Sequence, residues 1–223
     1  MKFYVLEPER GEMFGTKWAY ADQVDPVVLD EEGGIKCPVC GEFVRGLPWL
    51  PPHRVKLSSA KPEKWGDFVW GAGFDLIVSD RFKAVYEREG LTGITAFYPV
   101  EVVRVGMRKS GDLPPGLPTY YLVEIVWGGA NQDDVASKVV YKRKPSCSYC
   151  RTDGYMVRKE GIILEEGSWT GADILFARGA GSIIISERFK EAVEKYGLKN
   201  AWLIPAEKYG WDEYRPGLWY ILD

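Results

Sequence analysis

The sequence lacks several features that would point to an enzyme or to a membrane protein. Its 223 residues include one histidine, His53, and a lone histidine is more often structural or exposed than a general base. No Walker-type phosphate loop, G-x-S-x-G nucleophile motif or H-E-x-x-H metal motif occurs. No stretch approaches the run of about 18 apolar residues that a transmembrane helix needs. These absences favour a non-enzymatic protein that does not cross a membrane.

The N-terminus also lacks the pattern of a secretory signal peptide. Met1–Pro8 has the alternation of a strand, without a basic stretch followed by a long apolar region. We therefore expect a cytoplasmic protein, in which cysteine thiols stay reduced. With 46% hydrophobic and 27% charged residues, the composition is that of an ordinary globular protein.

Cysteine is scarce, and its four copies form two C-x-x-C pairs. Cys37 and Cys40 are separated from Cys147 and Cys150 by the 106 residues 41–146. Two residues between cysteines let both sulfurs reach one ion around a tight turn, and four thiolates complete the shell of a structural Zn²⁺. In a reducing compartment this twinned pattern is more typical of a metal site than of disulfides. We therefore predict one structural zinc that joins distant parts of the chain.

Two other interpretations of the cysteines are weaker. They could be reduced, partly buried residues that hold no metal. They could also be redox-active, because Cys37-Pro-Val-Cys40 superficially resembles a thioredoxin-type motif. In that motif a helix follows and lowers the pKa of the first thiol, whereas Gly41, Gly46 and three nearby prolines disfavour a helix here. A hydrolytic metal is disfavoured as well, because four thiolates leave no open position for water.

An internal repeat follows the cysteine pairs. Aligned without gaps, Leu76–Leu91 and Ile183–Leu198 are identical at 8 of 16 positions. In both segments a serine, Ser79 or Ser186, follows an apolar run and can cap a helix by accepting from a first-turn amide. A glycine near the end of each segment can adopt the left-handed conformation that ends a helix. The repeat predicts two short helices that arose by duplication.

The chain is expected to form a single α+β domain over residues 1–223. Frequent short apolar segments and two helices favour a mixed or antiparallel sheet. The repeat halves span roughly residues 37–105 and 147–209. A zinc site that takes ligands from both halves requires them to meet, which favours one continuous unit. The oligomeric state does not follow from these patterns.

The pattern of cysteines resembles the double-CXXCG family found in paralogous sets in myxobacteria. The resemblance extends to the N-terminus, Met-Lys-Phe-Tyr-Val-Leu. It also includes the final unit, in which a strand, a helix that begins with Ser-Glu-Arg-Phe and a second strand follow one another, so it runs across nearly the whole chain. Residues 37–41 match the first motif in full, whereas Arg151 replaces the glycine that ends the second. Members of that family are associated with contact-dependent toxin systems as immunity proteins.

This resemblance implies a small antidote that binds a cognate toxin and neutralises it by covering it. Many such toxins are basic nucleases, and an acidic surface speeds their association by electrostatic steering. Residues 7–32 carry eight acids and two bases. We therefore expect the inhibitory surface there, with two aromatic residues and five acids as candidates: Trp18, Tyr20, Asp22, Asp25, Asp30, Glu31 and Glu32.

The alternative is a zinc-containing module that binds nucleic acid. Residues 138–159 carry seven bases and one acid, and Tyr149 and Tyr155 could stack on bases between them. A pI of about 5.5 and the presence of a single basic patch disfavour this function. The bland interpretation, in which both charged segments are simply solvated faces, also stays open.

Overall fold

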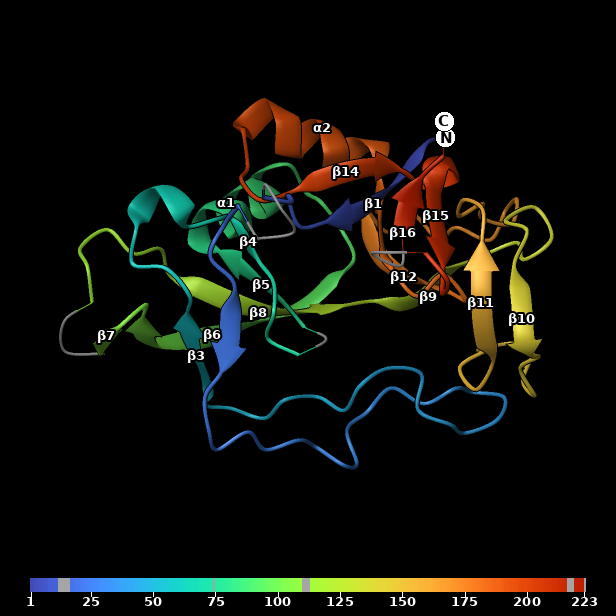
Figure 1. The fold of residues 1–223 in the computed structure, drawn as a ribbon, viewed down its shortest axis with the longest axis horizontal. Helices are drawn as coiled ribbons and strands as arrows, with labels where there is room; N and C mark the ends of the chain where they lie inside the picture. The colour runs from blue at the N-terminus through green and yellow to red at the C-terminus, as the bar shows by residue number, and fades with distance from the viewer. Residues whose placement is uncertain (12–16, 74, 110–112, 216–218, 223) are drawn as a thin grey trace.

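The computed structural model describes residues 1–11, 17–73, 75–109, 113–215 and 219–222. In these residues the fold is dominated by strands, arranged in three sheets, with two α-helices packed together on one side (Figure 1). Two short 3₁₀ turns, Pro62–Lys64 and Ala206–Lys208, complete the regular structure. None of the described helices is both long and apolar enough to span a membrane.

The largest sheet belongs to the first half of the chain. Its strand order is β2-β3-β6-β8-β5-β4, and β7 pairs with the end of β6. All neighbours run antiparallel except β3 and β6, so the sheet is mixed. The strands are β2 (Ala21–Gln23), β3 (His53–Leu57), β4 (Phe68–Val69), β5 (Leu76–Ser79), β6 (Ile94–Val105), β7 (Arg108–Lys109) and β8 (Tyr120–Ile125).

The other two sheets come mainly from the second half. A mixed sheet has the order β14-β1-β13-β12-β9, in which only β12 and β9 are parallel. Its strands are β1 (Phe3–Glu7), β9 (Trp127–Asn131), β12 (Ile174–Arg178), β13 (Ile183–Ser186) and β14 (Trp202–Pro205). An antiparallel sheet has the order β10-β11-β15-β16. Its strands are β10 (Val140–Arg143), β11 (Tyr155–Lys159), β15 (Tyr209–Asp212) and β16 (Trp219–Ile221).

Both helices begin as the sequence predicts. The helices are α1 (Asp80–Arg88), between β5 and β6, and α2 (Glu187–Tyr196), between β13 and β14. The hydroxyls of Ser79 and Ser186 accept from amides in the first turns, at 3.1 and 3.2 Å. Their apolar faces share one core, in which the rings of Phe82 and Phe189 lie 5.8 Å apart.

Each helix also receives a cation from the other at its C-terminal end. Arg81, in the first turn of α1, donates to the last carbonyls of α2, and Arg188, in the first turn of α2, donates to the last carbonyls of α1. A positive charge at a helix C-terminus is stabilising, because the carbonyls there carry partial negative charge. Asp67 and Asp173 pair with the two arginines at 2.8 and 3.0 Å. The two repeated segments therefore hold each other through matching contacts.

Replacing either aspartate with asparagine is expected to lower the free energy of unfolding by about 2 kcal/mol. Asp67 and Asp173 are buried, and each also accepts from the hydroxyl of the N-cap serine at 2.7 Å. The amide would weaken the bond to the arginine and bring a donor toward the serine. Urea denaturation of Asp67→Asn and Asp173→Asn checks this. Losses within about 1 kcal/mol of each other are expected, and a loss in only one variant would contradict the matching roles.

A long irregular hairpin, residues 24–52, leaves the large sheet between β2 and β3; we call it the arm. Its two passes are joined by backbone hydrogen bonds, such as Leu50 to Val28 and Asp30 to Pro48, both 2.8 Å. The turn at its tip is the first C-x-x-C pair, starting at Cys37. In Figure 1 the arm runs along one side of the molecule toward β10 and β11. The arm thereby carries the first cysteine pair far from the sheet it leaves.

Candidate metal centre

The four cysteines converge at the tip of the arm. Their sulfurs all lie within 4.8 Å of one another, with 3.9 Å between Cys37 and Cys147 and 3.7 Å between Cys40 and Cys150. A tetrahedral ion with metal–sulfur bonds of about 2.3 Å places its ligand sulfurs about 3.8 Å apart. The predicted convergence of these residues is confirmed, and the cluster is compatible with a metal ion.

Both cysteine pairs lie in tight turns of the same geometry. The Cys37 carbonyl accepts from the amide of Gly41 at 2.9 Å, and the Cys147 carbonyl accepts from the amide of Arg151 at 3.0 Å. Each turn ends in a left-handed residue, with φ of 80° at Gly41 and 60° at Arg151. Glycine adopts this conformation without strain, whereas arginine does so at a cost. The second turn therefore needs compensation that the first does not.

Backbone amides point at the sulfurs and help to hold negative charge there. The Val39 amide donates to the Cys37 sulfur at 3.4 Å. Burial alone would raise the pKa of the Cys150 thiol, but hydrogen bonds from Thr152 and from neighbouring thiols outweigh it and lower that pKa to about 7. A hydrogen bond from the Glu42 amide lowers the pKa of the Cys40 thiol, but desolvation and the other three thiols raise it to about 12. One thiolate therefore forms readily in this cluster, and a bound cation would displace the remaining protons.

The cluster has an apolar side and an open side. Cys37, Cys147 and Cys150 are buried, and Val44, Trp127 and Tyr149 pack against them. Cys40 is exposed. Three buried ligands that come from the arm and from the loop between β10 and β11 suit an ion that holds these two segments together.

Arg151 compensates for its strained backbone through its side chain, which is only 8% exposed. The guanidinium pairs with Asp134 at 2.7 Å and donates to the carbonyls of Gln132 and Arg178 at 2.9 and 2.8 Å. It also donates to the side chain of Asn131. Charge-assisted bonds of this kind are stronger than neutral ones. Arg151 therefore ties the second cysteine turn to the ends of β9 and β12.

Replacing Arg151 with glycine tests this balance. The glycine would relieve roughly 1 kcal/mol of backbone strain, but the partly buried Asp134 would lose its cation and two carbonyls a donor. We expect Arg151→Gly to lower the free energy of unfolding by about 2 kcal/mol. Its metal content should equal that of the wild type, because neither arginine nor glycine at position 151 supplies a ligand to the ion. A variant that is more stable than the wild type would contradict this account.

The acids proposed for partner binding differ in their exposure and in their position relative to the arm. Asp25, Glu31 and Glu32 are exposed on the arm. Asp30 is half-buried, and its carboxylate accepts from the amides of Glu32 and Gly33 at 3.0 and 2.8 Å, so it shapes the arm. Asp22 lies on β2 before the arm and is exposed, 3.9 Å from Lys56. Three of the five acids are thus free to face a partner on the arm itself.

The two aromatic candidates lie at the base of the arm or away from it. Tyr20 precedes β2 and is 41% exposed. Trp18 is half-buried between the ammonium groups of Lys17 and Lys199, the latter in the loop between α2 and β14. Sequence reasoning had not singled out Val28, Leu29 and Leu50, which are 52%, 46% and 38% exposed on the arm. The signal in the sequence that could have identified Val28 and Leu29 is the apolar run Val27-Val28-Leu29 inside an acidic segment.

The basic segment is less exposed than its composition suggests. Lys159 is buried, and its ammonium donates to the Ala180 carbonyl at 2.5 Å. Burial lowers the pKa of Lys159 to about 7, although Glu7 and Asp134 act in the opposite direction. Arg151 is turned inward as described, and Tyr149 is covered by the guanidinium of Arg178, 4.2 Å from the ring centre. Two of the seven bases, Arg151 and Lys159, therefore have their charged groups turned inward, and one of the two tyrosines has its ring covered by an arginine.

Comparison with known proteins returned no match, either among models of protein families or among curated proteins. The resemblance to the double-CXXCG family thus stays a prediction based on the residues quoted above. The functional argument depends on the geometry of the cysteine cluster and of the arm.

Proposed function

We propose that this chain is an immunity protein that binds a cognate protein toxin and blocks it sterically. The observation that carries the proposal is the position of the cysteine cluster, at the tip of an arm whose exposed residues are mostly acidic or apolar. An inhibitor of this kind needs a firmly held surface and no catalytic group. We infer that a bound ion holds this surface in one conformation.

The ion is proposed to be Zn²⁺ in a structural role. Four sulfurs at the observed spacing suit tetrahedral coordination, and soft thiolates favour zinc over hard cations such as Mg²⁺ and Ca²⁺. A closed shell of four thiolates leaves no position for water, so the ion would hold the fold and do no chemistry. Reduced cysteines suit the cytoplasm, where we place the protein.

The surface proposed to meet the toxin is the exposed part of the arm. Asp25, Glu31 and Glu32 would attract a basic toxin. Val28 and Leu29 would be buried in the complex, and apolar residues surrounded by charge are typical of protein interfaces. Because the two passes of the arm are joined by isolated bridges and not by a continuous strand ladder, its shape would depend on the anchored tip.

We also infer that the two strand–helix–strand units descend from one ancestral unit within an α+β fold. The support is the identity of 8 of 16 residues in Leu76–Leu91 and Ile183–Leu198 together with the matching arginine contacts of the two helices. In the proposed immunity protein these units form the base from which the arm extends.

Co-expression tests the proposed function directly. Each toxin domain encoded beside the gene for this chain would be expressed in cells with and without the chain. We expect one toxin to arrest growth alone and to be tolerated with the chain, and we expect the two proteins to copurify. Growth arrest by every such toxin in the presence of stably expressed chain would contradict the proposal.

A further inference from the structure

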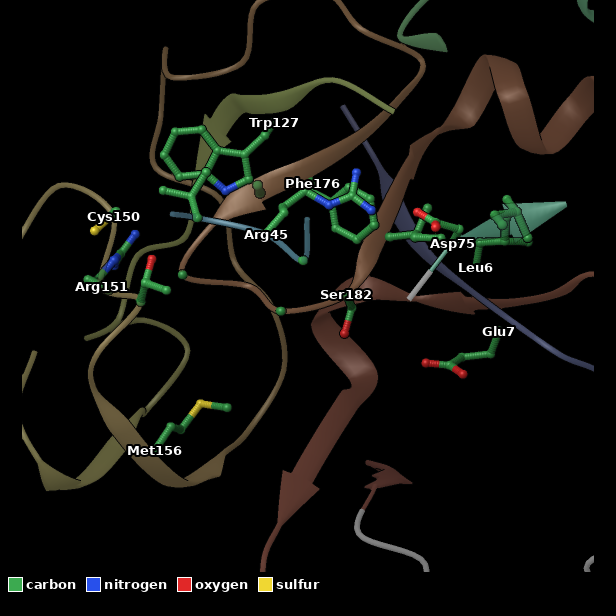
Figure 2. A pocket seen from close by; sticks show the side chains of 18 of the residues that line it. Leu6, Glu7, Arg45, Asp75, Trp127, Cys150, Arg151, Met156, Phe176 and Ser182 are labelled. Atoms are coloured by element: carbon green, nitrogen blue, oxygen red, sulfur yellow. The ribbon is translucent and has the colours of Figure 1, made fainter. Parts of the chain in front are cut away.

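A cavity of 570 Å³ lies beside the metal centre, between the arm and the five-stranded sheet (Figure 2). Its volume is within the range of about 300–1,000 Å³ that small-molecule sites occupy. Two glycine-rich turns at matching places in the two repeats, Gly71–Gly73 and Gly179–Gly181, form part of its wall. A second cavity of 370 Å³ shares Arg45, Gly46 and Asp75 with the first. These three residues therefore stand where the two cavities meet.

Arg45 brings a cation into this space from the arm. Its guanidinium lies over the ring of Phe176 at 3.8 Å and donates to the Ile125 carbonyl at 3.3 Å. In the described part of the chain no acid lies within 4.0 Å of this guanidinium. Burial lowers the pKa of Arg45, although Asp75 and Glu124 act in the opposite direction. The stacking on Phe176 fixes the plane of the Arg45 guanidinium. Most of its N–H donors make no hydrogen bond to the residues that the structure describes.

Asp75 brings an anion to the same junction from the turn before β5. Burial raises the pKa of its carboxyl, although Arg45 and His53 act in the opposite direction. In the residues that the structure describes, no basic nitrogen lies within 4.0 Å of this carboxylate. In Figure 2 Arg45 and Phe176 lie side by side, with Asp75 to one side of them and Trp127 to the other. The two charged groups interact electrostatically but form no direct ion pair.

Two poorly hydrated opposite charges that are held apart are costly unless a third group pairs with both. A ligand in this space that pairs with both groups needs a hydrogen-bond acceptor for Arg45 and a donor for Asp75. A cyclic amide edge, with its carbonyl beside its ring N–H, has this pattern. Trp70 and Trp127 contribute aromatic rings to the lining, and the guanidinium of Arg45 stacked on Phe176 adds a flat charged surface; these features favour a planar ligand.

We propose that this cavity binds a small planar heterocycle through a cyclic-amide edge, with its carbonyl on Arg45 and its ring N–H on Asp75. Guanine, hypoxanthine and related lactams belong to this class. Unsubstituted purine, studied as its riboside, has the same fused rings but neither the carbonyl nor the ring N–H, so it serves as the matched comparison. The inference concerns a ligand of the free protein and does not depend on toxin binding.

The test is a set of titrations followed by calorimetry or by tryptophan fluorescence. Guanosine and inosine are expected to bind, whereas purine riboside and 1-methylinosine, which both lack the ring N–H, should bind at least about tenfold more weakly than inosine. Asp75→Asn should lose guanosine binding by a similar factor and stay folded, since the carboxylate makes no ion pair with the residues that the structure describes. Arg45→Met should lose it too, and Glu191→Gln, a change on the exposed face of α2, should not.

Three outcomes would overturn the proposal. One is equal affinity for inosine and purine riboside, which would leave the cyclic-amide edge without a role. Another is the absence of guanosine and inosine binding at millimolar concentration. The third is unchanged guanosine binding in Asp75→Asn, which would remove the carboxylate from the site.

Discussion

Cys147→Ser is expected to release the metal and to lower the free energy of unfolding by about 4 kcal/mol. That figure corresponds to a site filled at a free metal concentration about a thousand times its dissociation constant. Serine cannot replace a thiolate in a four-sulfur shell, and Cys147 is buried among the other ligands. The loss should be large because the ion joins segments that the chain separates by residues 41–146.

Metal content per chain and urea denaturation measure this prediction together. Ser148→Ala is the matched control, since Ser148 lies between the cysteines of the same turn and is exposed. The control should keep one zinc per chain and wild-type stability. A Cys147→Ser protein that retains both its metal and its stability would show that the cluster does not depend on this ligand, and the structural role of the ion would be lost.

Neutralising the acids of the arm is expected to slow toxin association roughly tenfold at low salt. The triple variant changes Asp25 to asparagine and Glu31 and Glu32 to glutamine, all exposed. Asp30 is left intact, because its carboxylate shapes the turn. Added salt should reduce the difference, since mobile ions screen charges that are separated by solvent.

A matched control separates the position of the charges from net charge. It neutralises three exposed acids outside the arm, Glu63, Glu166 and Glu191, and changes the net charge by the same amount. Surface plasmon resonance with the toxin found by co-expression gives both association rates. Equal rates for the two triple variants would mean that the arm does not guide the encounter.

Local chemistry made the helices and the cysteine turns predictable from the sequence. Ser79 and Ser186 cap helices because a hydroxyl can accept from an orphan amide whatever lies further away. The glycine in the first cysteine turn follows from its left-handed backbone, and the same geometry explains why Arg151 at the equivalent position makes so many contacts. Such features depend on a few neighbouring residues and need no tertiary information.

Pairing between distant segments could not be read in the same way. β1, at the N-terminus, lies between β13 and β14 from the second half of the chain, and no local sequence pattern predicts this pairing. The sequence predicted a four-cysteine site but not that one cysteine pair forms the tip of an arm. Arg45 and Asp75 come together only because the arm folds back on the sheet, so their shared cavity had no signal in the sequence.

The measurement that tests the account most directly is hydrogen exchange of the arm with the metal bound and after its removal by a chelator. The account predicts that the amides of Asp30, Val44 and Leu50, which join the two passes of the arm, lose protection when the metal leaves. Amides within α1 and α2 should stay protected, since their contacts lie elsewhere. Arm amides that remain equally protected without metal would contradict the claim that the four-cysteine centre holds the binding surface.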